Sequence, residues 1–476
     1  MAGSSGDSSP RDAAGLDLVF KAYDVRGLVP EQFDAALARR IGAAFVEVLG
    51  IRTQDGGPGA VVIGQDMRPS GDELVAAFAD GVCAQGCDVI RIGLASTDGL
   101  YFASGDLGLP GAMFTASHNP AQYNGIKLCR AGAAPVGSET GLRAMRDLVE
   151  QGIPTYDGPA GSVTRRDTLP AYASFLRSLV DLSAGRDLSV VIDAGNGMAG
   201  LTAPAVLGTQ AGLPALPLSI TPLYFELDGT FPNHEANPIE PANLRDLQRA
   251  VVEVGADIGL AFDGDADRCF VIDERGVAVT PSAITALIAE RELQRRPGST
   301  IIYNCISSRA VPEVISECGG VGERTRVGHS FIKARMAETG AVFGGEHSGH
   351  FYFTDFWRAD SGMLAAMHVL AALGSAPAGT TLSSLLARYD RYVASGEINS
   401  VVDDAAAATD RVRKAYTGQE EVTFDDLDGM TVSAPDWWFN LRPSNTEPLL
   451  RLNVEAVDAG TMESVRDEVL AIVREP

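Results

Sequence analysis

The sequence predicts an α/β protein with three related α/β domains, each built on a mixed sheet, and a smaller C-terminal α+β domain. Short apolar segments with strand character recur at 60–63, 189–192 and 300–303, and a helix-compatible segment follows each one. Their separations are too long for a solenoid, so we expect separate sheets covered by helices. From about residue 381, helix-like and strand-like stretches alternate. The length of 476 residues favours several domains, because single cores stop growing at roughly 250 to 300 residues.

The composition indicates a cytoplasmic enzyme. The formal net charge of −24 argues against nucleic acid and against anionic membranes as partners. Residues 1–15 are rich in serine, glycine and aspartate, which predicts a disordered tail and not a signal peptide. No apolar run reaches transmembrane length. Six cysteines without paired spacing predict free thiols in a reducing compartment.

The segment TASHNP at Thr115–Pro120 offers a candidate nucleophile. Ser117 lies among hydrogen-bonding side chains, and Pro120 forces the preceding residue out of the α region, so we expect the hydroxyl on an exposed turn. A serine that carries phosphate is a phosphoryl donor. The alternative is a helix N-cap followed by a proline turn. The turn signal Asn124-Gly125 and the cation Lys127 favour the functional interpretation, because they bring a phosphate partner close.

Glycines at Gly195–Gly200 match the G-x-G-x-x-G pattern of a dinucleotide-binding turn and follow the strand-like segment 189–192. An acidic ribose partner is expected roughly 20 residues further on. That neighbourhood is apolar and proline-rich, and Glu226 and Asp228 come late. A plain strand-to-helix turn is therefore the preferred interpretation.

Three carboxylates alternate with small residues in Asp263–Asp267, between the apolar runs 258–262 and 269–272. On a regular strand they would stand roughly 7 Å apart, too far for one small ion. Gly264 and Ala266 permit a tight loop that brings the oxygens together. The pattern predicts a magnesium site in a connection between two buried strands. A solvated acidic turn is the alternative, and the EF-hand pattern fails because no glutamate follows at the required position.

The segment GEHSGH at 345–350 suits the hydroxyl groups of a sugar. Glu346 and Ser348 supply a carboxylate and a hydroxyl two residues apart, between glycines that let a ligand approach. The alternative is a metal site. It ranks lower because His347 and His350 lack further cysteines or histidines at zinc-site spacing.

The segment RPSNTEP at 442–448 suits a phosphate group. Arg442 offers a bidentate fork, and hydroxyl and amide side chains follow it. A polar surface turn is the alternative. The aromatic run 437–439 before the segment and the alternating run 449–454 after it place this turn between two strands, at a pocket mouth.

In this order and spacing, the four segments resemble the α-D-phosphohexomutase superfamily, most closely its bacterial phosphomannomutase/phosphoglucomutase branch. The resemblance covers nearly the whole chain and includes further blocks at 22–27, 64–68, 193–197, 231–234 and 328–330. It implies four domains around a central cleft, with one catalytic segment in each. The predicted limits are 1–162 with the phosphoserine loop, 163–277 with the metal-binding loop, 278–380 with the sugar-binding loop, and 381–476 with the phosphate-binding loop.

The resemblance also implies roles for individual residues. Ser117 would carry the phosphate, and Asp263, Asp265 and Asp267 would hold Mg²⁺ against Ser117. The implied substrate-binding residues are Glu346, Ser348, Arg442, Ser444, Asn445 and Thr446. The residues implied to neutralise charge or act as acids and bases are Arg26, His118, Lys127, Arg268, His329 and His350.

The activity that the resemblance implies is a phosphohexose mutase that interconverts hexose 1-phosphate and hexose 6-phosphate, with mannose or glucose as the sugar. Phosphorylated Ser117 gives its phosphoryl group to the sugar, and the hexose 1,6-bisphosphate turns around before a phosphate returns. Asn445 favours this branch over phosphoglucosamine mutase, which usually carries glycine there, while His347 replaces the common methionine. Alternatives of another class are a magnesium-dependent sugar phosphatase and a catalytically silent sugar-phosphate-binding protein.

One departure from the family pattern concerns a lysine that related mutases often carry just after the strand equivalent to 301–305. Here the chain continues with Ile306, and no lysine stands there. The resemblance therefore implies that this role is absent or has moved to Arg309 or Lys333. Because the substrate is an anion and the chain is acidic overall, the cations of the motifs are expected to concentrate at the site. The oligomeric state does not follow from the sequence.

Overall fold

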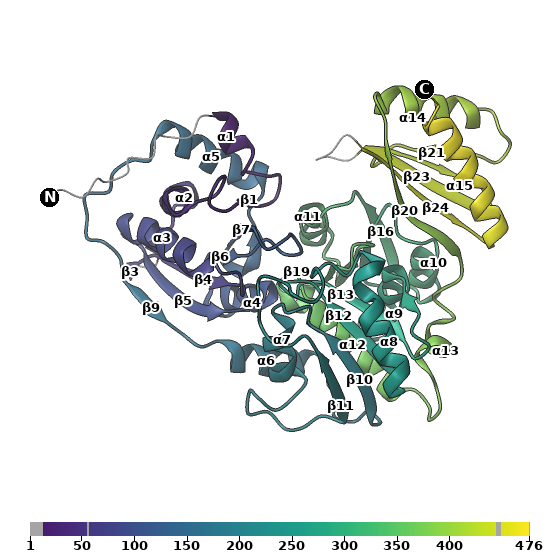
Figure 1. Cartoon of the computed structure of the whole chain (residues 1–476), viewed down its shortest axis with the longest axis horizontal. Helices are drawn as coiled ribbons and strands as arrows, with labels where there is room; N and C mark the ends of the chain where they lie inside the picture. Colours follow the sequence, from purple (N-terminus) through teal and green to yellow (C-terminus); the bar gives the residue numbers. More distant parts are fainter. Residues whose placement is uncertain (1–12, 55–56, 444–448, 476) are drawn as a thin grey trace. The chain divides into compact units, whose positions relative to one another are not determined.

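The structure is a computed structural model that describes residues 13–54, 57–443 and 449–475. It divides into two compact units. The first unit comprises Met1–Val279 and Gly349–Leu382, and the second comprises Thr280–Ser348 and Ser383–Pro476. Figure 1 shows the elements, coloured along the sequence. None of the described helices is both long enough and apolar enough to cross a bilayer.

The first sheet of the first unit has the strand order β1-β7-β6-β4-β5-β9, with β8 paired to β7. Strand β4 runs parallel to both β5 and β6, whereas β7 is antiparallel to β1 and β6. The sheet is therefore mixed, as predicted. Its strands are β1 (Val25–Leu28), β4 (Ala60–Gln65), β5 (Asp88–Leu94), β6 (Gly111–Phe114), β7 (Tyr123–Arg130), β8 (Ala134–Pro135) and β9 (Val163–Arg165); a separate hairpin joins β2 (Thr53–Gln54) and β3 (Gly57–Pro58).

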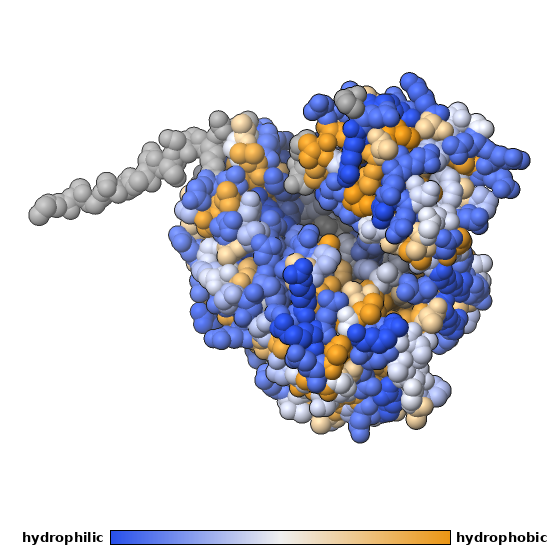
Figure 2. All heavy atoms as spheres, turned by 45° about the vertical axis from the view of Figure 1, so that its right-hand side comes forward, coloured by the Kyte–Doolittle hydropathy of each residue, from blue (hydrophilic) through white to orange (hydrophobic). Residues whose placement is uncertain are grey.

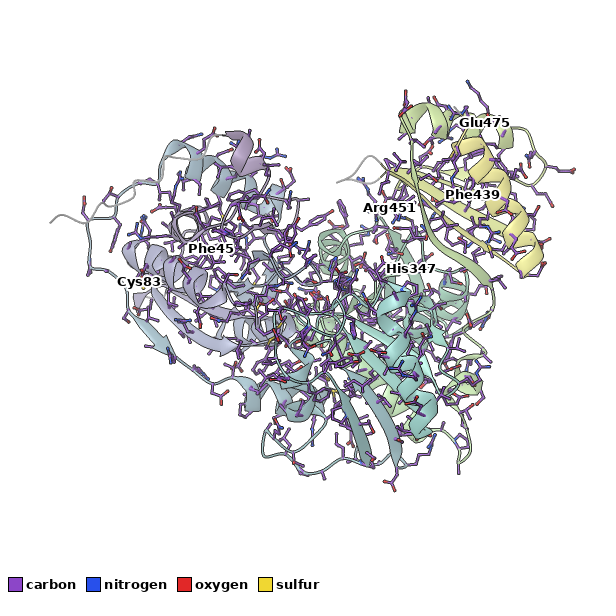
Figure 3. The ribbon with its side chains drawn as sticks, in the orientation of Figure 1. Phe45, Cys83, His347, Phe439, Arg451 and Glu475 are labelled. Atoms are coloured by element: carbon purple, nitrogen blue, oxygen red, sulfur yellow. The ribbon has the colours of Figure 1, made fainter. Side chains whose placement is uncertain are left out.

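Helices cover both faces of this sheet, which explains why β4 is a continuous apolar run. Val61 and Ile63 belong to the core that includes Phe45 of α2 and Phe78 of α3. Val62 faces the opposite way, into a smaller core with α4. Phe45, labelled in Figure 3, has its ring centroid 6.0 Å from that of Phe78. The helices of this region are α1 (Ala13–Asp17), α2 (Ala35–Leu49), α3 (Gly71–Ala84), α4 (Thr97–Leu107) and α5 (Leu142–Gln151), with short 3-10 turns at Ala131–Ala133 and Ser138–Thr140.

The second sheet has the order β11-β10-β12-β13-β14, with β10 parallel to its two neighbours and β12 antiparallel to β13. One face packs on α8 through residues such as Val191, Leu247 and Val251. Its elements are β10 (Leu188–Asp193), β11 (Leu218–Leu223), β12 (Ile258–Phe262), β13 (Cys269–Asp273), β14 (Ala278–Val279), α6 (Leu169–Leu179), α7 (Ala199–Val206), the 3-10 turn Pro241–Leu244 and α8 (Arg245–Val254). The first unit also contains β18 (Phe351–Phe353), the 3-10 turn Thr354–Phe356, β19 (Ala359–Asp360) and α12 (Gly362–Ser375).

The second unit contains a parallel arrangement β16-β15-β17 and a separate antiparallel sheet, β20-β24-β23-β22-β21. Helix α15 packs on the antiparallel sheet, and Phe439, labelled in Figure 3, lies in their common core with Val465 and Val469. The elements are α9 (Pro281–Arg295), β15 (Thr300–Asn304), α10 (Ala310–Glu317), β16 (Val321–Thr325), α11 (His329–Thr339), β17 (Phe343–Gly345), α13 (Leu382–Leu386), β20 (Val393–Val401), α14 (Ala405–Tyr416), β21 (Thr423–Asp425), β22 (Met430–Ser433), β23 (Trp437–Pro443), β24 (Leu449–Ala456) and α15 (Ala459–Val473).

The internal repeat predicted from the sequence is present. The three recurring segments form β4, β10 and β15, and each of these strands lies between two parallel neighbours. A helix follows each of them, α3, α7 and α10. The prediction of three related α/β domains and a smaller α+β domain is confirmed.

One local prediction was wrong. Asn124-Gly125 is not a turn but part of strand β7, where Gly125 pairs with Arg26 of β1. A Cβ atom on Gly125 would lie 2.2 Å from the carbonyl oxygen of Val25. The glycine is needed for the close approach of two backbones, a requirement that a turn signal does not reveal.

The face of the molecule in Figure 2 carries mostly hydrophilic side chains, with apolar ones scattered in small groups. This agrees with the general preference of polar side chains for the surface.

Candidate active site

The loop after β6 lies at a topological switch point of the first sheet. The chain passes from β4 through α3 to β5 on one side of β4, and then through α4 to β6 on the other side. In such sheets ligands bind in the crevice beyond the carboxyl ends of the strands where the order reverses. Thr115 and Ser117 follow β6, and Asp66 follows β4 at the same edge.

Ser117 occupies a constrained position in this loop. Its φ is 50°, in the left-handed region that costs a residue other than glycine about 1 to 3 kcal/mol. Its backbone N–H donates to Thr115 Oγ1 at 2.8 Å. The residue is only 4% exposed, so the prediction of an exposed turn was wrong. The alternative of a helix N-cap is also wrong, because strand β7 and no helix follows this loop.

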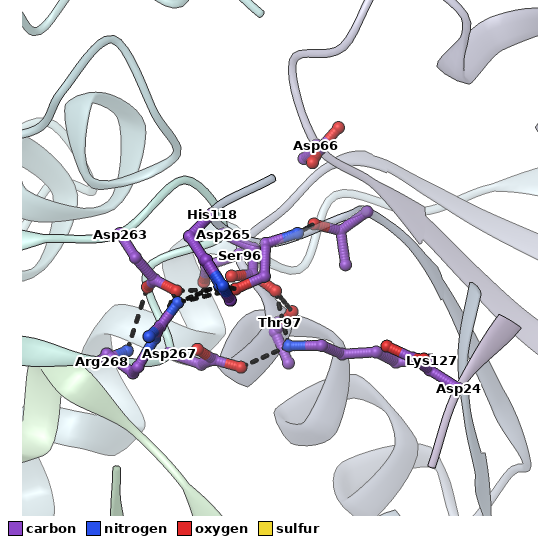
Figure 4. Close-up of polar contacts among 12 residues, drawn as sticks. Asp24, Asp66, Ser96, Thr97, His118, Lys127, Asp263, Asp265, Asp267 and Arg268 are labelled. Carbon is purple, nitrogen blue, oxygen red and sulfur yellow. Dashed lines mark hydrogen bonds and ion pairs between the residues drawn. The ribbon is translucent and has the colours of Figure 1, made fainter. Parts of the chain in front are cut away.

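The side chain of Ser117 meets three other functional side chains. Its hydroxyl donates to Asp263 Oδ2 at 2.8 Å, and Arg268 Nη2 donates to Ser117 Oγ at 3.2 Å. His118 Nδ1 lies 3.3 Å from the same oxygen. Figure 4 shows His118, Asp263 and Arg268 converging at this point. A hydroxyl surrounded by one carboxylate and one guanidinium is suited to carry an anionic group.

The three aspartates lie on the connection between β12 and β13, as predicted. The two strands are antiparallel and pair up to Phe262 and Cys269, and the loop Asp263–Arg268 joins them. Ala266 has a φ of 58°. A Cβ atom on Gly264 would lie 2.5 Å from the carbonyl oxygen of Ser117, so glycine is required for the two loops to touch.

The geometry of the aspartates fits a metal ion. Asp263, Asp265 and Asp267 are buried, and one carboxylate oxygen of each lies within 4.8 Å of the others. Within the described part of the chain, the Oδ1 atoms of Asp265 and Asp267 are buried and accept no hydrogen bond. Buried acceptors of this kind are costly unless a cation or donor satisfies them. Carboxylate oxygens are the ligands that Mg²⁺ prefers, so the donor set agrees with the predicted ion.

Lys127 compensates part of this negative charge. Its Nζ atom donates to Asp265 Oδ2 at 2.7 Å and also to Asp267 Oδ2. Burial alone would raise the pKa of Asp265, but Lys127 and the hydrogen bonds to this carboxylate hold that pKa well below its usual range. Burial raises the pKa of Asp263 to about 7, although Arg268 opposes the shift. Lys127 and Arg268 therefore neutralise only part of the negative charge of the three carboxylates.

His118 is held in its neutral form. Burial, together with the charges of Arg268 and Arg26, lowers the pKa of His118 well below its usual value. The guanidinium of Arg268 donates to His118 Nδ1. Because an arginine is only a donor, Nδ1 must be the unprotonated nitrogen and the ring proton lies on Nε2. Nε2–H is then the donor that His118 can offer to a ligand.

Two further predicted residues lie around the same loops. Arg26 donates to Asn119 Oδ1 at 2.5 Å and pairs with Asp24. His350 Nε2 lies 3.7 Å from Asp267 Oδ1, and the backbones of His350 and Arg268 form an antiparallel bridge. The first unit thus brings together the six predicted residues Ser117, His118, Arg26, Lys127, Arg268 and His350 with the aspartate triad. His329 begins helix α11 in the second unit, and its side chain lies outside the described residues.

In the second unit, Glu346 and Ser348 follow β17 directly. Glu346 is buried, and its Oε1 atom accepts a hydrogen bond from the backbone N–H of Gly328 at 3.0 Å. Ser348 is half-buried. Glu346 is thereby fixed beside the start of α11, with the Gly328 loop as its support.

Arg442 lies near the end of β23, and β24 begins after the segment 444–448, so the two predicted strands are confirmed and the segment between them lies outside the described residues. Arg442 Nη2 donates to Glu397 Oε2 at 2.6 Å, a partner on β20 that the sequence did not reveal. Burial lowers the pKa of His347; Glu397 opposes this shift and Arg442 adds to it. His347 therefore lies within electrostatic range of Glu397 and Arg442 in this unit. Ser444, Asn445 and Thr446 lie outside the described residues.

The two candidates for the missing lysine differ in their surroundings. The guanidinium of Arg309 donates to the backbone oxygens of Ala434, Pro435 and Trp437 at 2.6 to 3.0 Å. Arg309 therefore braces the C-terminal sheet, and its donors are committed to the backbone. Lys333 lies on α11 and is buried.

Three residues near the site were missed by sequence reasoning. Thr97, the first residue of α4, donates from Oγ1 to Asp265 Oδ2 at 2.6 Å and from its backbone N–H to the Asp265 carbonyl at 3.0 Å. Asp98 accepts hydrogen bonds from Tyr172 and Ser361. Arg68 contacts the backbone of the Ser117 loop. Only Arg68 had a sequence signal, since it belongs to the block 64–68.

Models of the phosphoglucomutase/phosphomannomutase family match four parts of the chain. Domain I, described as alpha/beta/alpha, matches residues 17–152; domain II matches 170–276; domain III matches 280–392; and the C-terminal domain matches 397–472.

Individual proteins match over almost the full length. "Phosphohexose mutases" of Xanthomonas campestris pv. campestris is 41% identical over 96% of this chain and 99% of that protein. "Phosphomannomutase" of Salmonella montevideo is 40% identical over 95% of this chain and 98% of that protein. A crystal structure of a phosphoglucomutase/phosphomannomutase family protein from Burkholderia thailandensis superposes with a TM-score of 0.84 at 34% identity, and covers 96% of this chain and 97% of that chain.

Proposed function

The chain belongs to the phosphoglucomutase/phosphomannomutase family, and from that premise we propose that it interconverts hexose 1-phosphate and hexose 6-phosphate, with mannose or glucose as the sugar. The observation that carries the proposal is the contact of the Ser117 hydroxyl with Asp263 at 2.8 Å, beside two buried carboxylate oxygens without hydrogen-bond donors among the described residues. This arrangement supports a phosphorylated serine next to a divalent cation.

In the proposed reaction, phosphorylated Ser117 gives its phosphoryl group to the free hydroxyl of the sugar phosphate. The Ser117 Oγ–P bond breaks and a new O–P bond forms on the sugar, while the proton of the sugar hydroxyl passes to Ser117 Oγ, which yields a hexose 1,6-bisphosphate and the free serine. The bisphosphate turns around and returns its other phosphate to Ser117. Arg268, which donates to Ser117 Oγ, would neutralise the charge that develops on this oxygen.

Asp263, Asp265 and Asp267, together with the phosphate on Ser117, would hold Mg²⁺. The ion would supply charge neutralisation for the phosphoryl oxygens when it is bound. Lys127 donates to two of these carboxylates and would keep them oriented. Asp263 accepts the hydroxyl proton of unphosphorylated Ser117, so it is suited to take this proton when the phosphate returns.

The remaining predicted residues would orient the substrate. Arg26 and His118 lie around the Ser117 loop, and His350 lies beside Asp267, so they are proposed to neutralise phosphate charge or to move protons. His329 is proposed for the same set from the sequence alone. Glu346 and Ser348 are proposed to bind the sugar hydroxyls. Arg442, Ser444, Asn445 and Thr446 are proposed to grip the phosphate that is not reacting.

The experiment that tests this function is a set of coupled assays with mannose 1-phosphate, glucose 1-phosphate and glucosamine 1-phosphate, each with a trace of the matching bisphosphate and Mg²⁺. We expect turnover of the first two sugars. Turnover of glucosamine 1-phosphate alone would make the enzyme a phosphoglucosamine mutase. Net release of inorganic phosphate in a parallel assay would favour the phosphatase, and inactivity toward all three sugars would contradict the proposal.

Two further points belong to the same proposal. The domain limits 1–162, 163–277, 278–380 and 381–476 remain predictions, with one functional loop in each domain.

The cytoplasm is the proposed cellular compartment of the enzyme, supported by six cysteines that are all free thiols in the structure.

A further inference from the structure

A single guanidinium binds four backbone carbonyl groups in and directly after the Ser117 loop. Arg68 Nη1 donates to the carbonyl oxygens of Pro120 and Tyr123, both at 2.8 Å. Arg68 Nη2 donates to the carbonyl oxygens of Asn119 at 2.6 Å and Ser117 at 3.0 Å. The side chain of Arg68 is fully buried, and its hydrogen bonds go to these backbone carbonyls and to Asp66. One residue therefore supplies hydrogen bonds to four carbonyl groups of this segment, and the Pro120 carbonyl also accepts from the backbone N–H of Tyr123.

Arg68 is itself held from several sides. Asp66 accepts from Arg68 Nε at 3.2 Å and from its backbone N–H at 3.0 Å. The ring of Phe231, from the region of the second sheet, lies 5.3 Å from the guanidinium carbon. A Cβ atom on Gly229 would lie 2.6 Å from Arg68 Cα. These contacts fix the orientation of the guanidinium, so it is a rigid support, or template, for the conformation of the loop.

The loop needs such a template. Ser117 has a positive φ, a conformation that persists only where surrounding contacts over-determine it. Four carbonyl groups of the segment turn toward the Arg68 guanidinium, and a buried carbonyl without a donor destabilises the folded state. The Ser117 carbonyl also faces Gly264, whose missing side chain leaves room for it. The direction of the Ser117 carbonyl, set by Arg68, fixes the direction of its side chain.

We propose that Arg68 is a positioning residue for phosphoryl transfer. It holds Ser117 in the left-handed conformation so that Oγ points at Asp263 and Arg268. This inference rests on the proposed function, since it assigns to Arg68 the orientation of the phosphorylated serine. Arg68 acts through the loop backbone and does not contact the substrate.

The same unit offers a matched control. Arg177 on α6 donates to the carbonyl oxygens of Val206, Gly208 and Pro214, and so braces a loop with the same chemistry. That loop carries none of the predicted site residues. A purely structural role would make the loss of Arg68 resemble the loss of Arg177.

The test compares Arg68→Lys and Arg177→Lys in the full-length enzyme. Lysine keeps the charge but cannot reach four oxygens with a planar fork. We expect Arg68→Lys to lower kcat on the order of 100-fold, because small displacements of a reacting group have effects of this size. KM should change by less than about twofold, since substrate contacts are intact. Arg177→Lys should keep the wild-type kcat, even if its Tm falls as much as the Tm of Arg68→Lys.

A readout without turnover completes the test. Phosphoenzyme is prepared with glucose 1,6-bisphosphate, and the ³¹P resonance of the phosphoserine is recorded for wild type and both variants. We expect a changed shift in Arg68→Lys and an unchanged one in Arg177→Lys. Equal kcat losses in the two variants, or a wild-type kcat in Arg68→Lys, would overturn the proposal. If Arg68→Lys does not fold, Asp66→Asn decides in its place, with the same two readouts and a smaller expected loss of kcat.

The two proposals fail in different ways. Wild-type protein that takes up no phosphate from the bisphosphate and yet turns over substrate would contradict the role of Ser117 in the proposed function. A wild-type phosphoenzyme with an unperturbed Arg68→Lys variant would leave the mutase proposal standing and refute the positioning role.

Discussion

The hydroxyl of Ser117 donates to Asp263 Oδ2 at 2.8 Å, although 146 residues separate the two in the sequence. The contact joins the loop after β6 to the connection between β12 and β13. Gly264 makes it possible, because any side chain there would collide with the Ser117 carbonyl. The nucleophile of one sheet and the carboxylates of another thereby form a single centre.

Ser117→Ala should abolish most mutase turnover and leave the fold intact, because the phosphoryl relay loses its point of attachment. Intact-mass measurement should show part of the wild type heavier by one phosphate and none of the variant. Ser178→Ala is the control, since Ser178 is exposed on α6 and its hydroxyl donates to the Phe175 carbonyl. Activity in wild-type protein that never carries phosphate, even after bisphosphate treatment, would rule out this role of Ser117.

Asp265→Asn should raise the Mg²⁺ concentration needed for half-maximal activity and lower turnover, because the ion loses one charged ligand. Titration calorimetry with Mg²⁺ should show the weaker binding directly. Asp80→Asn, an exposed change on α3, should leave both values unchanged. If neither Asp265→Asn nor a chelator affected activity, the aspartate loop would not be a metal site.

Arg442→Ala should impair the reaction of the 1-phosphate and of the 6-phosphate together, because both would use the same clamp. A charge-assisted hydrogen bond is worth about 1.5 to 3 kcal/mol, which sets the expected loss in kcat/KM. The variant should also need added glucose 1,6-bisphosphate more than wild type, since the intermediate escapes more often.

The variant Glu397→Gln distinguishes two roles of Arg442, namely phosphate binding and a structural ion pair with Glu397. It removes the charge that Arg442 faces and keeps Arg442 itself. We expect a milder loss than in Arg442→Ala, measured as kcat/KM in both directions. Equal losses in the two variants would mean that Arg442 acts only through Glu397, and a loss in one direction only would refute the shared clamp.

Asp98 should make folding stability depend on pH. Burial raises the pKa of this carboxyl to about 6, against 3.8 for an ordinary aspartate, even though Ser361, Ser96 and Tyr172 donate to it. Between pH 4 and 6 the native state then binds more protons than the unfolded state, so this contribution to stability is lost as the pH rises through 6.

The measurement is the free energy of unfolding by urea at several pH values for wild type and Asp98→Asn. The wild type should lose up to about 3 kcal/mol relative to the variant between pH 4 and 7, and no more above it. Parallel pH profiles of the two proteins would contradict the shift assigned to Asp98.

Local pattern was sufficient for much of the fold and for the choice of segments. The aspartate loop between two apolar runs and the two strands on either side of residues 444–448 were predicted correctly, because hydrophobic periodicity is a property of neighbouring residues. The repeat of β4, β10 and β15 was also visible, since fully buried parallel strands are continuous apolar runs.

The errors and omissions share one cause. Ser117 was expected on an exposed turn, and Asn124-Gly125 was expected in a turn. The local sequence of each segment does not reveal which other segments pack against it. Thr97 and Asp98 were missed because the sequence at the start of an ordinary helix does not indicate hydrogen-bond partners more than 70 residues away.

The fold class, the internal repeat and the short segments that hold chemical groups can be deduced from the sequence, because each of these features depends on residues that lie close together along the chain. Tertiary structure alone decided that Ser117 meets Asp263, that Lys127 pairs with Asp265 and Asp267, and that Arg68 holds four carbonyl groups. These contacts depend on how sheets and loops pack. Burial then decides their strength, since a charge or a hydroxyl away from water interacts mainly with the partners that packing supplies.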